Sequence, residues 1–195
     1  RAFVTQLLSL ITPRQRGKIG FNIGGAADAQ SKQRLALPPL VIDADGLNHL
    51  AEIPTWWEHL PAGRAVLTPH PGEMRRLLKA DEMPGDPVDA AEQSAKAWGQ
   101  IVVLKGATTV VASPDGRSAL LDGGNAALAS AGTGDVLAGV ICGLLAQGLA
   151  PYEAAISGVY LHSAAGRILR DDMGDAGTLA SDLLVRLPLA IRALR

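Results

Sequence analysis

The sequence has one cysteine and few aromatic residues. Cys142 is the only cysteine among 195 residues, so no disulfide can form within the chain. This usage is typical of a reducing compartment, and we expect a cytoplasmic protein. Aromatic residues make up 4% of the chain, which argues against a platform on which nucleic-acid bases would stack. Cys142 lies in an apolar run, where we expect a small buried side chain.

The chain also lacks an excess of positive or negative charge. The chain has 18 Lys and Arg against 19 Asp and Glu, a formal net charge of -1. No basic field is available to attract nucleic acid or an anionic membrane, so neither is an expected partner. The most apolar run, residues 136–150, is interrupted by three glycines and a glutamine and is too short to span a membrane. No signal peptide is visible.

Apolar periodicity predicts an α/β fold. Residues 2–11 have helical spacing, whereas residues 12–38 have little periodicity and are expected to be an irregular excursion. Strands are predicted at 39–43, 64–68 and 101–105, a hairpin at 109–113 and 117–121, and helices at 46–52, 54–60, 71–79, 87–98, 134–148, 151–170 and 181–194. This alternation predicts a single domain with a mainly parallel sheet covered by helices on both faces.

Polar and ionisable residues follow three of the predicted strands. They lie in the segments Asp43–Asn48, Thr68–Glu73 and Lys105–Thr109. In open α/β sheets, ligands bind beyond the carboxyl ends of the parallel strands. The sequence therefore predicts one binding site at this edge of the sheet.

A glycine-containing turn, AGTGD at residues 131–135, precedes the long apolar helix. Glycine allows close approach of the backbone to a ligand, and a helix N-terminus offers unpaired N–H groups and partial positive charge. We predict an anion hole for a transferring phosphoryl group at Gly132, Thr133 and Gly134. Asp135 would accept a proton from an attacking hydroxyl group; the alternative is a simple helix cap. Expected burial of the apolar helix favours the catalytic role.

Each neighbouring candidate also has a structural alternative. His70, between two prolines, is predicted to face the site, but a surface loop histidine would give the same pattern. The alternative for Glu73 is an interaction with a helix dipole, and the alternative for Lys105 is a solvated surface lysine. His162 lacks such context and is expected to have a structural or surface role. No His/Cys spacing suggests a zinc site.

Five segments together resemble the NAD(P)H-hydrate dehydratases of the ribokinase-like superfamily. They are VIDADGLNHL, LTPHPGEMRRLL, VVLKGATTVV, NAALASAGTGDVLAGVICGLLAQG and GTLASDLL. GTGD alone is typical only of the superfamily, whereas DADGLN and HPGEM narrow the resemblance to the dehydratases. The resemblance implies a ribokinase-like fold and repair of NADH or NADPH that has been hydrated on the nicotinamide ring (NADHX and NADPHX). In this family, ADP or ATP phosphorylates the ring hydroxyl, and phosphate then leaves to restore the double bond.

The resemblance also implies residue roles and partners. Asp135 would be the catalytic base, and the hydrated dinucleotide would contact His70, Asp135, Asp45 and Asn48. The nucleotide would contact Lys105, Gly106, Ala107, Thr108, Thr109 and Gly134. Mg²⁺ is implied with the phosphates, with Glu73 as a candidate to hold it through water. A homo-oligomer and an NAD(P)H-hydrate epimerase domain in the full-length protein are implied as well.

The sequence departs from the family pattern in two places. Ala126 and Ala127 follow Asn125 where the family commonly has Pro-Gly, so alanine would be strained if that turn needs positive φ. The glycine-rich αβ half that begins the family domain is not found, so the domain is expected to lack its N-terminal part. Two alternatives stay open. One is a ribokinase-like kinase for a vitamin precursor, which should lack the HPGE pattern, and the other is a non-catalytic nucleotide-binding module.

Overall fold

The computed structural model describes residues 2, 4–6, 38–83, 85–122 and 125–194. The strands are β1 (Leu40–Ile42), β2 (Ala65–Leu67), β3 (Ile101–Leu104), β4 (Thr108–Ala112) and β5 (Ser118–Asp122). The α-helices are α2 (Asp45–Ala51), α3 (Pro71–Leu78), α4 (Pro87–Trp98), α5 (Thr133–Ala146), α6 (Pro151–Met173), α7 (Ala180–Leu184) and α8 (Leu187–Arg192), and the 3₁₀ helices are η1 (Trp56–His59) and η2 (Ala126–Ala129). Residues 2 and 4–6 are helical as predicted, while most of the predicted 12–38 excursion lies outside the described residues.

The five described strands form one sheet in the order β1-β2-β3-β4-β5. β1, β2 and β3 pair in parallel, whereas β4 pairs antiparallel with both β3 and β5. Within this sheet β4 is therefore the one strand that runs against the others. The predicted turn at Pro114–Gly116 closes the β4–β5 hairpin, where Ser113 N donates to Arg117 O at 2.8 Å. The prediction of an α/β fold with a mainly parallel sheet is confirmed.

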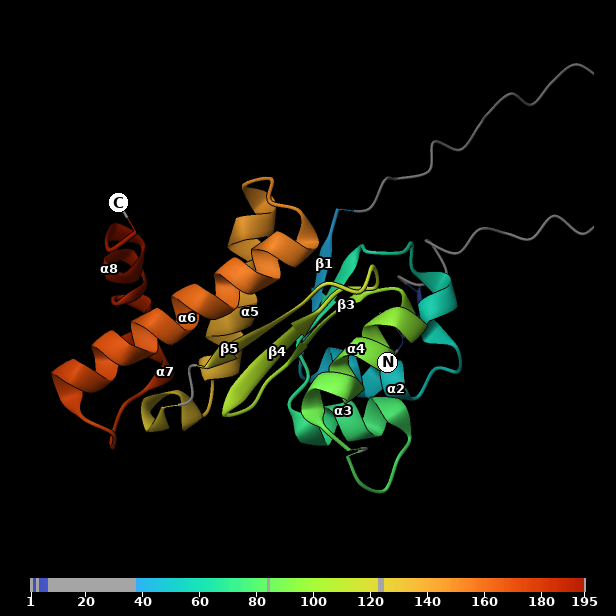
Figure 1. Cartoon of the computed structure of the whole chain (residues 1–195), viewed down its shortest axis with the longest axis horizontal. Helices are drawn as coiled ribbons and strands as arrows, with labels where there is room; N and C mark the ends of the chain where they lie inside the picture. The colour runs from blue at the N-terminus through green and yellow to red at the C-terminus, as the bar shows by residue number, and fades with distance from the viewer. Residues whose placement is uncertain (1, 3, 7–37, 84, 123–124, 195) are drawn as a thin grey trace, which may run out of the picture.

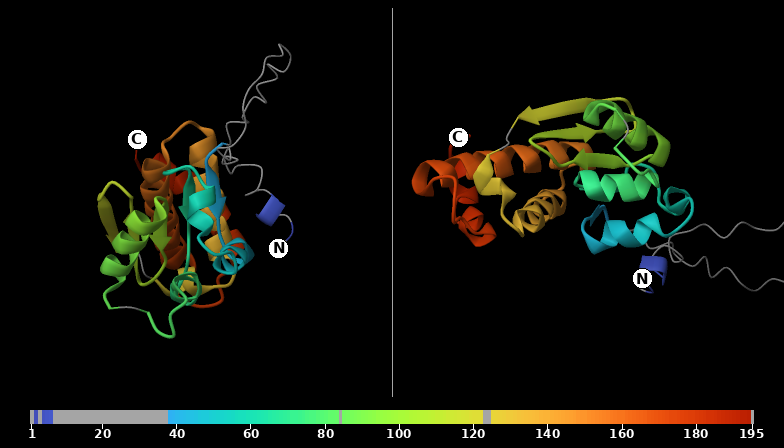
Figure 2. Two further views of the ribbon diagram at one scale, coloured as in Figure 1. Left: turned by 90° about the vertical axis from the view of Figure 1, so that its right-hand side faces the viewer. Right: turned by 90° about the horizontal axis from the view of Figure 1, so that it is seen from below.

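Helices cover both faces of the sheet (Figures 1 and 2). Alternate strand residues point to opposite faces, so Leu67 and Val102 belong to one core cluster and Val66 and Val103 to another. The first cluster also contains residues of α2, α3 and α4, and the second contains residues of α5 and α6. α7 and α8 pack beside α6 in a third cluster, away from β1 (Figure 1).

Two predicted helices, at residues 181–194 and 54–60, were wrong in extent or type. The predicted helix 181–194 is divided into α7 and α8, with Pro188 in the first turn of α8, where its missing N–H is tolerated. Leu179 is the N-cap of α7, and its N–H donates to Asp182 Oδ2 at 2.8 Å. The segment 54–60 contains only the 3₁₀ helix η1, and η2 was not predicted.

α5 is less buried than its composition predicted. It buries Thr133, Leu137 and Ile141, but Cys142 and its neighbour Gly143 are exposed. The sheet, α6 and α7 contact other parts of this helix. The expected burial of Cys142 was therefore wrong. Among the described helices, none is long and apolar enough to cross a membrane.

Close approach of α5 and α6 depends on Gly158. An ideal Cβ atom at this position would lie 2.6 Å from Ile141 Cγ1, and Ile141 is fully buried. Gly139, on α5, has no heavy atom within 4 Å of the equivalent position. Substitutions at these two glycines therefore distinguish the effect of helix packing from the effect of intrinsic helix propensity.

We predict that Gly158→Ala lowers the free energy of unfolding by about 1–3 kcal/mol, because the added methyl group overpacks the α5–α6 contact. The matched Gly139→Ala should raise it by up to about 1 kcal/mol, since alanine is the better helix former. Urea unfolding of both variants measures these changes. An unchanged or more stable Gly158→Ala would contradict the packing argument.

Candidate functional site

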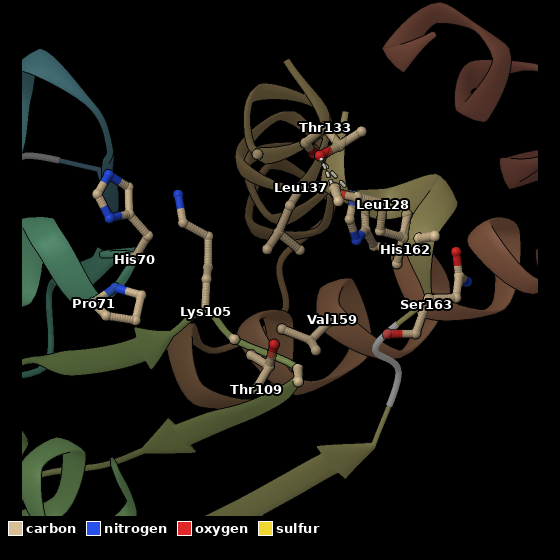
Figure 3. A pocket seen from close by; sticks show the side chains of 16 residues that line it. His70, Pro71, Lys105, Thr109, Leu128, Thr133, Leu137, Val159, His162 and Ser163 are labelled. Atoms are coloured by element: carbon tan, nitrogen blue, oxygen red, sulfur yellow. Dashed lines mark hydrogen bonds between the residues drawn. The ribbon is translucent and has the colours of Figure 1, made fainter. Parts of the chain in front are cut away.

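The carboxyl ends of β1, β2 and β3 meet at one edge of the sheet, beside the N-terminus of α5. Asp43 follows β1, His70 lies beyond β2, and Lys105 follows β3. A pocket of about 600 Å³ opens here, with walls from the β2 and β3 ends, η2, α5 and α6 (Figure 3). Its volume lies within the range of small-molecule sites.

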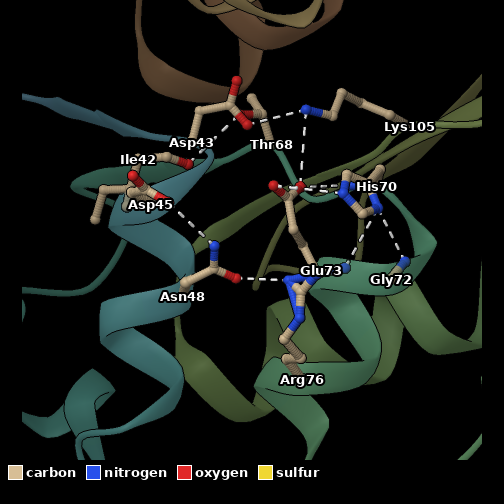
Figure 4. Close-up of polar contacts among 10 residues, drawn as sticks. All are labelled: Ile42, Asp43, Asp45, Asn48, Thr68, His70, Gly72, Glu73, Arg76 and Lys105. Atoms are coloured by element: carbon tan, nitrogen blue, oxygen red, sulfur yellow. Dashed lines mark hydrogen bonds and ion pairs between the residues drawn. The ribbon is translucent and has the colours of Figure 1, made fainter.

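Lys105 is held by carboxylates at this edge. Its backbone N–H donates to Pro69 O at 2.8 Å, which ties the β3 end to the β2 end. Its Nζ donates to Asp43 Oδ1 at 2.9 Å and lies 3.9 Å from Glu73 Oε2 (Figure 4). The Lys105 side chain is 20% exposed. Lys105 is therefore a partly buried, paired cation and not the freely solvated lysine of the structural alternative.

The Asp43 carboxylate is positioned by a strained backbone. Ala44 has φ 48° and ψ -122°, a combination that residues other than glycine rarely adopt. Such a conformation costs on the order of 1–3 kcal/mol, and strained residues gather at functional sites. The sharp turn at Ala44 leaves Asp43 beside Lys105, while Asp45 begins α2 (Figure 4).

His70 and Glu73 form the N-terminal cap of α3. His70 Nδ1 accepts hydrogen bonds from the backbone N–H groups of Gly72 and Glu73 at 3.0 and 3.4 Å, and Glu73 Oε2 accepts one from His70 N at 2.8 Å. This capping box satisfies backbone donors that begin the helix. Because Nδ1 accepts, the neutral ring carries its proton on Nε2, which lies 3.6 Å from Glu73 Oε1. The half-exposed ring of His70 also lines the pocket.

The predicted anion hole is a tightly shaped turn. Gly132 has φ 87°, which favours glycine, and an ideal Cβ atom there would lie 3.1 Å from Ala180 Cβ, a tight contact. The Thr133 hydroxyl group lies 2.7 and 2.9 Å from the carbonyl oxygens of Leu128 and Ser130. These contacts hold the turn against the loop that contains η2.

The missing side chain of Gly134 lets Lys105 approach the helix N-terminus. A Cβ atom at Gly134 would lie 3.3 Å from Lys105 Nζ and 3.9 Å from Asp43 Oδ2. The ammonium group and the first turn of α5 therefore face the same space. Both attract negative charge, so this part of the pocket suits a phosphate group.

Asn125, His162 and Ser163 line another part of the pocket. Both polar side-chain atoms of Asn125 are buried without a hydrogen-bond partner in the structure. His162 Nε2 lies 2.9 Å from Thr133 O. Burial lowers the pKa of His162 below its usual 6.5, as does the positive charge of Lys105, and the hydrogen bond to Thr133 opposes these effects. The imidazole is therefore neutral at pH 7.

Most predicted nucleotide contacts lie together. The pocket walls include five of the predicted nucleotide contacts, Lys105, Gly106, Ala107, Thr109 and Gly134, together with His70 and Thr133. Thr108 faces an adjoining groove that shares Lys105, Gly106 and Ala107 with the pocket. Glu73 is buried behind Lys105, and Gly132 shapes the turn without lining the pocket.

The structure does not bring three other predicted residues into the pocket wall. Asp135 is exposed and lines a separate shallow hollow with α5 residues and Leu184. Asn48 Oδ1 accepts from Arg76 Nη1 at 2.6 Å, and Asn48 Nδ2 donates to Asp45 Oδ1 at 3.4 Å, which links α2 to α3 (Figure 4). Because the outer face of α5 is exposed, the expected burial that favoured a catalytic Asp135 is not observed.

The alanines that replace Pro-Gly are not strained. Ala126 and Ala127 lie in η2, and neither has a positive φ. The turn after Asn125 is therefore compatible with L-residues.

Three residues at this site had no predicted ligand contact. Asp43 belongs to the polar segment that follows the first strand, but only Asp45 and Asn48 of that segment were predicted to contact a ligand. Asn125 was considered only as a family marker. His162 lies 29 residues from its partner Thr133, and no local pattern indicates that contact.

Comparison with known proteins decides the family. The sequence model of the NAD(P)H-hydrate dehydratases matches residues 23–189. The chain belongs to the NAD(P)H-hydrate dehydratase family. Relatives include the bifunctional NAD(P)H-hydrate repair enzyme of Moorella thermoacetica, 46% identical over 161 residues that cover 80% of this chain and 30% of that enzyme. The ADP-dependent (S)-NAD(P)H-hydrate dehydratase of Neisseria meningitidis is 43% identical over 150 residues, 74% of this chain and 50% of that enzyme.

Solved structures agree with the family assignment and the ribokinase-like fold. The ADP/ATP-dependent NAD(P)H-hydrate dehydratase of Bacillus subtilis, co-crystallized with ATP/Mg²⁺, has a TM-score of 0.68 and 33% identity, with 80% of this chain and 55% of that chain covered. A ribokinase-like superfamily protein of Enterococcus faecalis has a TM-score of 0.65 and 27% identity, with 80% and 52% covered. The chain thus spans between about a third and about half of the length of these relatives.

We predict that Ala44→Gly in this dehydratase-family chain is neutral or stabilising by up to about 1 kcal/mol, since glycine relieves the positive-φ strain but is more flexible when unfolded. The control Ala62→Gly, at an exposed turn residue without positive φ, should lose about 0.4–1 kcal/mol. Chemical unfolding compares the two. Equal losses at both positions would mean that Ala44 is not strained.

Proposed function

We propose that this chain catalyses the nucleotide-dependent dehydration of NADHX or NADPHX to NADH or NADPH. The observation that carries the proposal is the convergence of two family motifs on one pocket. Lys105, from KGATT, lies beside Gly134, from GTGD, although 29 residues separate them in sequence. The dehydratase activities named for the Neisseria and Bacillus relatives support the same function.

The pocket would bind the phosphates of ADP or ATP between Lys105 and the first turn of α5. An ammonium group and free helix N–H groups both favour phosphate oxygens. Gly106, Ala107, Thr108 and Thr109 continue from Lys105 along the pocket and its adjoining groove, where they would contact the rest of the nucleotide. The Neisseria relative is named as ADP-dependent and the Bacillus relative as ADP/ATP-dependent, so both nucleotides are candidates.

The carboxylates around Lys105 fit a Mg²⁺ ion that accompanies the nucleotide. Among the described residues no group of three or more His, Cys, Asp or Glu could hold a metal by itself. Mg²⁺ at nucleotide sites typically takes one or two carboxylates, with phosphate oxygens and water completing its shell. Asp43 and Glu73 are such a pair, both within 4 Å of Lys105 Nζ. When bound, the ion would supply positive charge that offsets the negative charge of the phosphates.

Asp135 would act as the base at the edge of this site. It follows Gly134 in the first turn of α5, and its exposed carboxylate can accept the proton of the ring hydroxyl. The hydroxyl oxygen then bonds to the terminal phosphorus of the nucleotide, and the bond to the bridging oxygen breaks. Loss of phosphate with the C–O electron pair, and of a proton from the adjacent ring carbon, restores the double bond.

Three further residues would contact the hydrated dinucleotide. His70 would contact the hydrated dinucleotide from the pocket wall, and Asp45 and Asn48 would do so from the start of α2. Residues 1–195 would form a single ribokinase-like domain of a cytoplasmic homo-oligomer. An NAD(P)H-hydrate epimerase domain elsewhere in the full-length protein would fit the bifunctional name of the Moorella relative.

The deciding experiment follows absorbance at 340 nm with purified chain, NADHX and Mg²⁺, with ADP and ATP in parallel. A nucleotide-dependent rise supports the dehydratase proposal, and the faster nucleotide identifies the phosphoryl donor. A folded chain that binds ADP without any rise would instead favour the nucleotide-binding module. The same assay on the full-length protein then tells whether further segments are needed for turnover.

We predict that Asp135→Asn reduces turnover by about 100-fold or more, because asparagine keeps the shape but cannot accept the proton. The affinity for ADP, measured by calorimetry, should change by no more than a few-fold. As a control, Asp175→Asn replaces an exposed aspartate outside the site. Near-normal turnover of Asp135→Asn would remove this residue from the mechanism.

We predict that Lys105→Ala weakens nucleotide binding by about 10- to 100-fold, since it removes a charged hydrogen bond worth about 1.5–3 kcal/mol. The KM for NADHX should change much less. Lys96→Ala, at an exposed position of α4, is the matched control and should leave both values unchanged. If Lys105→Ala behaves like this control, the phosphate assignment is wrong.

A further inference from the structure

His162 is a buried polar residue whose contact lies at the predicted anion hole. It belongs to α6, is 8% exposed, and its imidazole lies beside Thr133 in the pocket wall (Figure 3). Its Nε2 is 2.9 Å from Thr133 O. A carbonyl oxygen can only accept, so Nε2 carries the proton and donates it.

The peptide unit that receives this hydrogen bond also carries the Gly134 N–H. The six atoms of a peptide unit are planar, and the described chain has no cis peptide bond, so this C=O and N–H point in opposite directions. A further donor to Thr133 O, beside the hydrogen bond that this carbonyl group accepts within α5, therefore helps to hold the direction of the Gly134 N–H. Hydrogen bonds in such chains also polarise one another, so the bond from His162 makes that N–H a stronger donor.

The neighbouring peptide groups are held separately. The Thr133 hydroxyl group lies within hydrogen-bond distance of Leu128 O and Ser130 O, and the Ser130 hydroxyl group donates to Thr178 O at 2.8 Å. Thr178 belongs to the C-terminal GTLASDLL segment. These bonds anchor the loop before α5, whereas His162 acts on the first peptide unit inside the helix.

We propose that His162 is a positioning residue for phosphoryl transfer, which aims and polarises the Gly134 N–H through the carbonyl group of Thr133. The kinetic part of this inference rests on the proposed function, whereas the structural part does not. A donor that is held in place before the reaction stabilises developing charge without reorganisation. Loss of His162 should therefore affect the transfer step more than nucleotide binding.

The test compares His162→Leu, which removes the donor, with His162→Gln, whose amide nitrogen can reach the position of Nε2. Tyr160→Phe, at a 43% exposed position of the same helix, is the control. We expect His162→Leu to lower kcat by about 10-fold or more, less than the roughly 100- to 1000-fold effect of removing a direct donor. The Kd for ADP should stay within about threefold, and His162→Gln should retain most of the parent kcat.

A second measurement is independent of turnover. In ¹⁵N-labelled protein, the Gly134 amide resonance should shift in His162→Leu and stay near its parent position in His162→Gln. If the parent lacks turnover, the proposed function fails, but this resonance still tests the positioning role. If His162→Leu does not fold, His162→Asn replaces it, since asparagine is too short to reach Thr133 O.

Three results would overturn the proposal. The first is a folded His162→Leu or His162→Asn with parent kcat. The second is a Gly134 resonance that does not respond to loss of the donor. The third is a stable His162→Gln that loses as much activity as the variant without a donor, because the hydrogen bond would then not be the determining feature.

Discussion

The approach of the Lys105 ammonium group to the N-terminus of α5 is the interaction on which the site depends. Both groups are positive, so their proximity is unfavourable unless negative charge lies between or beside them. Asp43 and Glu73 supply that charge, with oxygens 2.9 and 3.9 Å from Lys105 Nζ. The chain thus concentrates positive potential at one end of the pocket and balances it with two carboxylates. In the proposed complex, a phosphate group would pair with Lys105, and its metal ion would pair with the two carboxylates.

Two energetically unfavourable features lie near this site. Ala44 holds a strained backbone beside Asp43, and Asn125 buries an amide group without a partner. Each costs on the order of 1–3 kcal/mol. The two core clusters on opposite faces of the sheet offset such costs, since the strand residues in both are fully or nearly fully buried. Rigid packing on both faces keeps the strand ends in place while the loops beyond them carry the strain.

α5 connects the packing to the chemistry. Its inner side packs on the sheet through Leu137 and Ile141, and Gly158 of α6 lets that helix lie close against it. This packing holds the first turn of α5 beside Lys105. His162 then links α6 to the same turn through Thr133 O. Contacts along one helix therefore determine the direction of the N–H groups at its end.

The sequence by itself determined most of the strands and helices and the local chemistry of this protein. Strand and helix periods, the 114–116 turn and the GTGD segment depend on neighbouring residues, and they predicted the α/β fold and the edge at which polar groups gather. Only the tertiary structure decided which groups meet there. Asp43 reaches Lys105 across 62 positions, His162 reaches Thr133 across 29, and the outer face of α5 is exposed despite its apolar composition. Residue patterns report the preferences of the local backbone, whereas burial and pairing depend on which distant surfaces pack together.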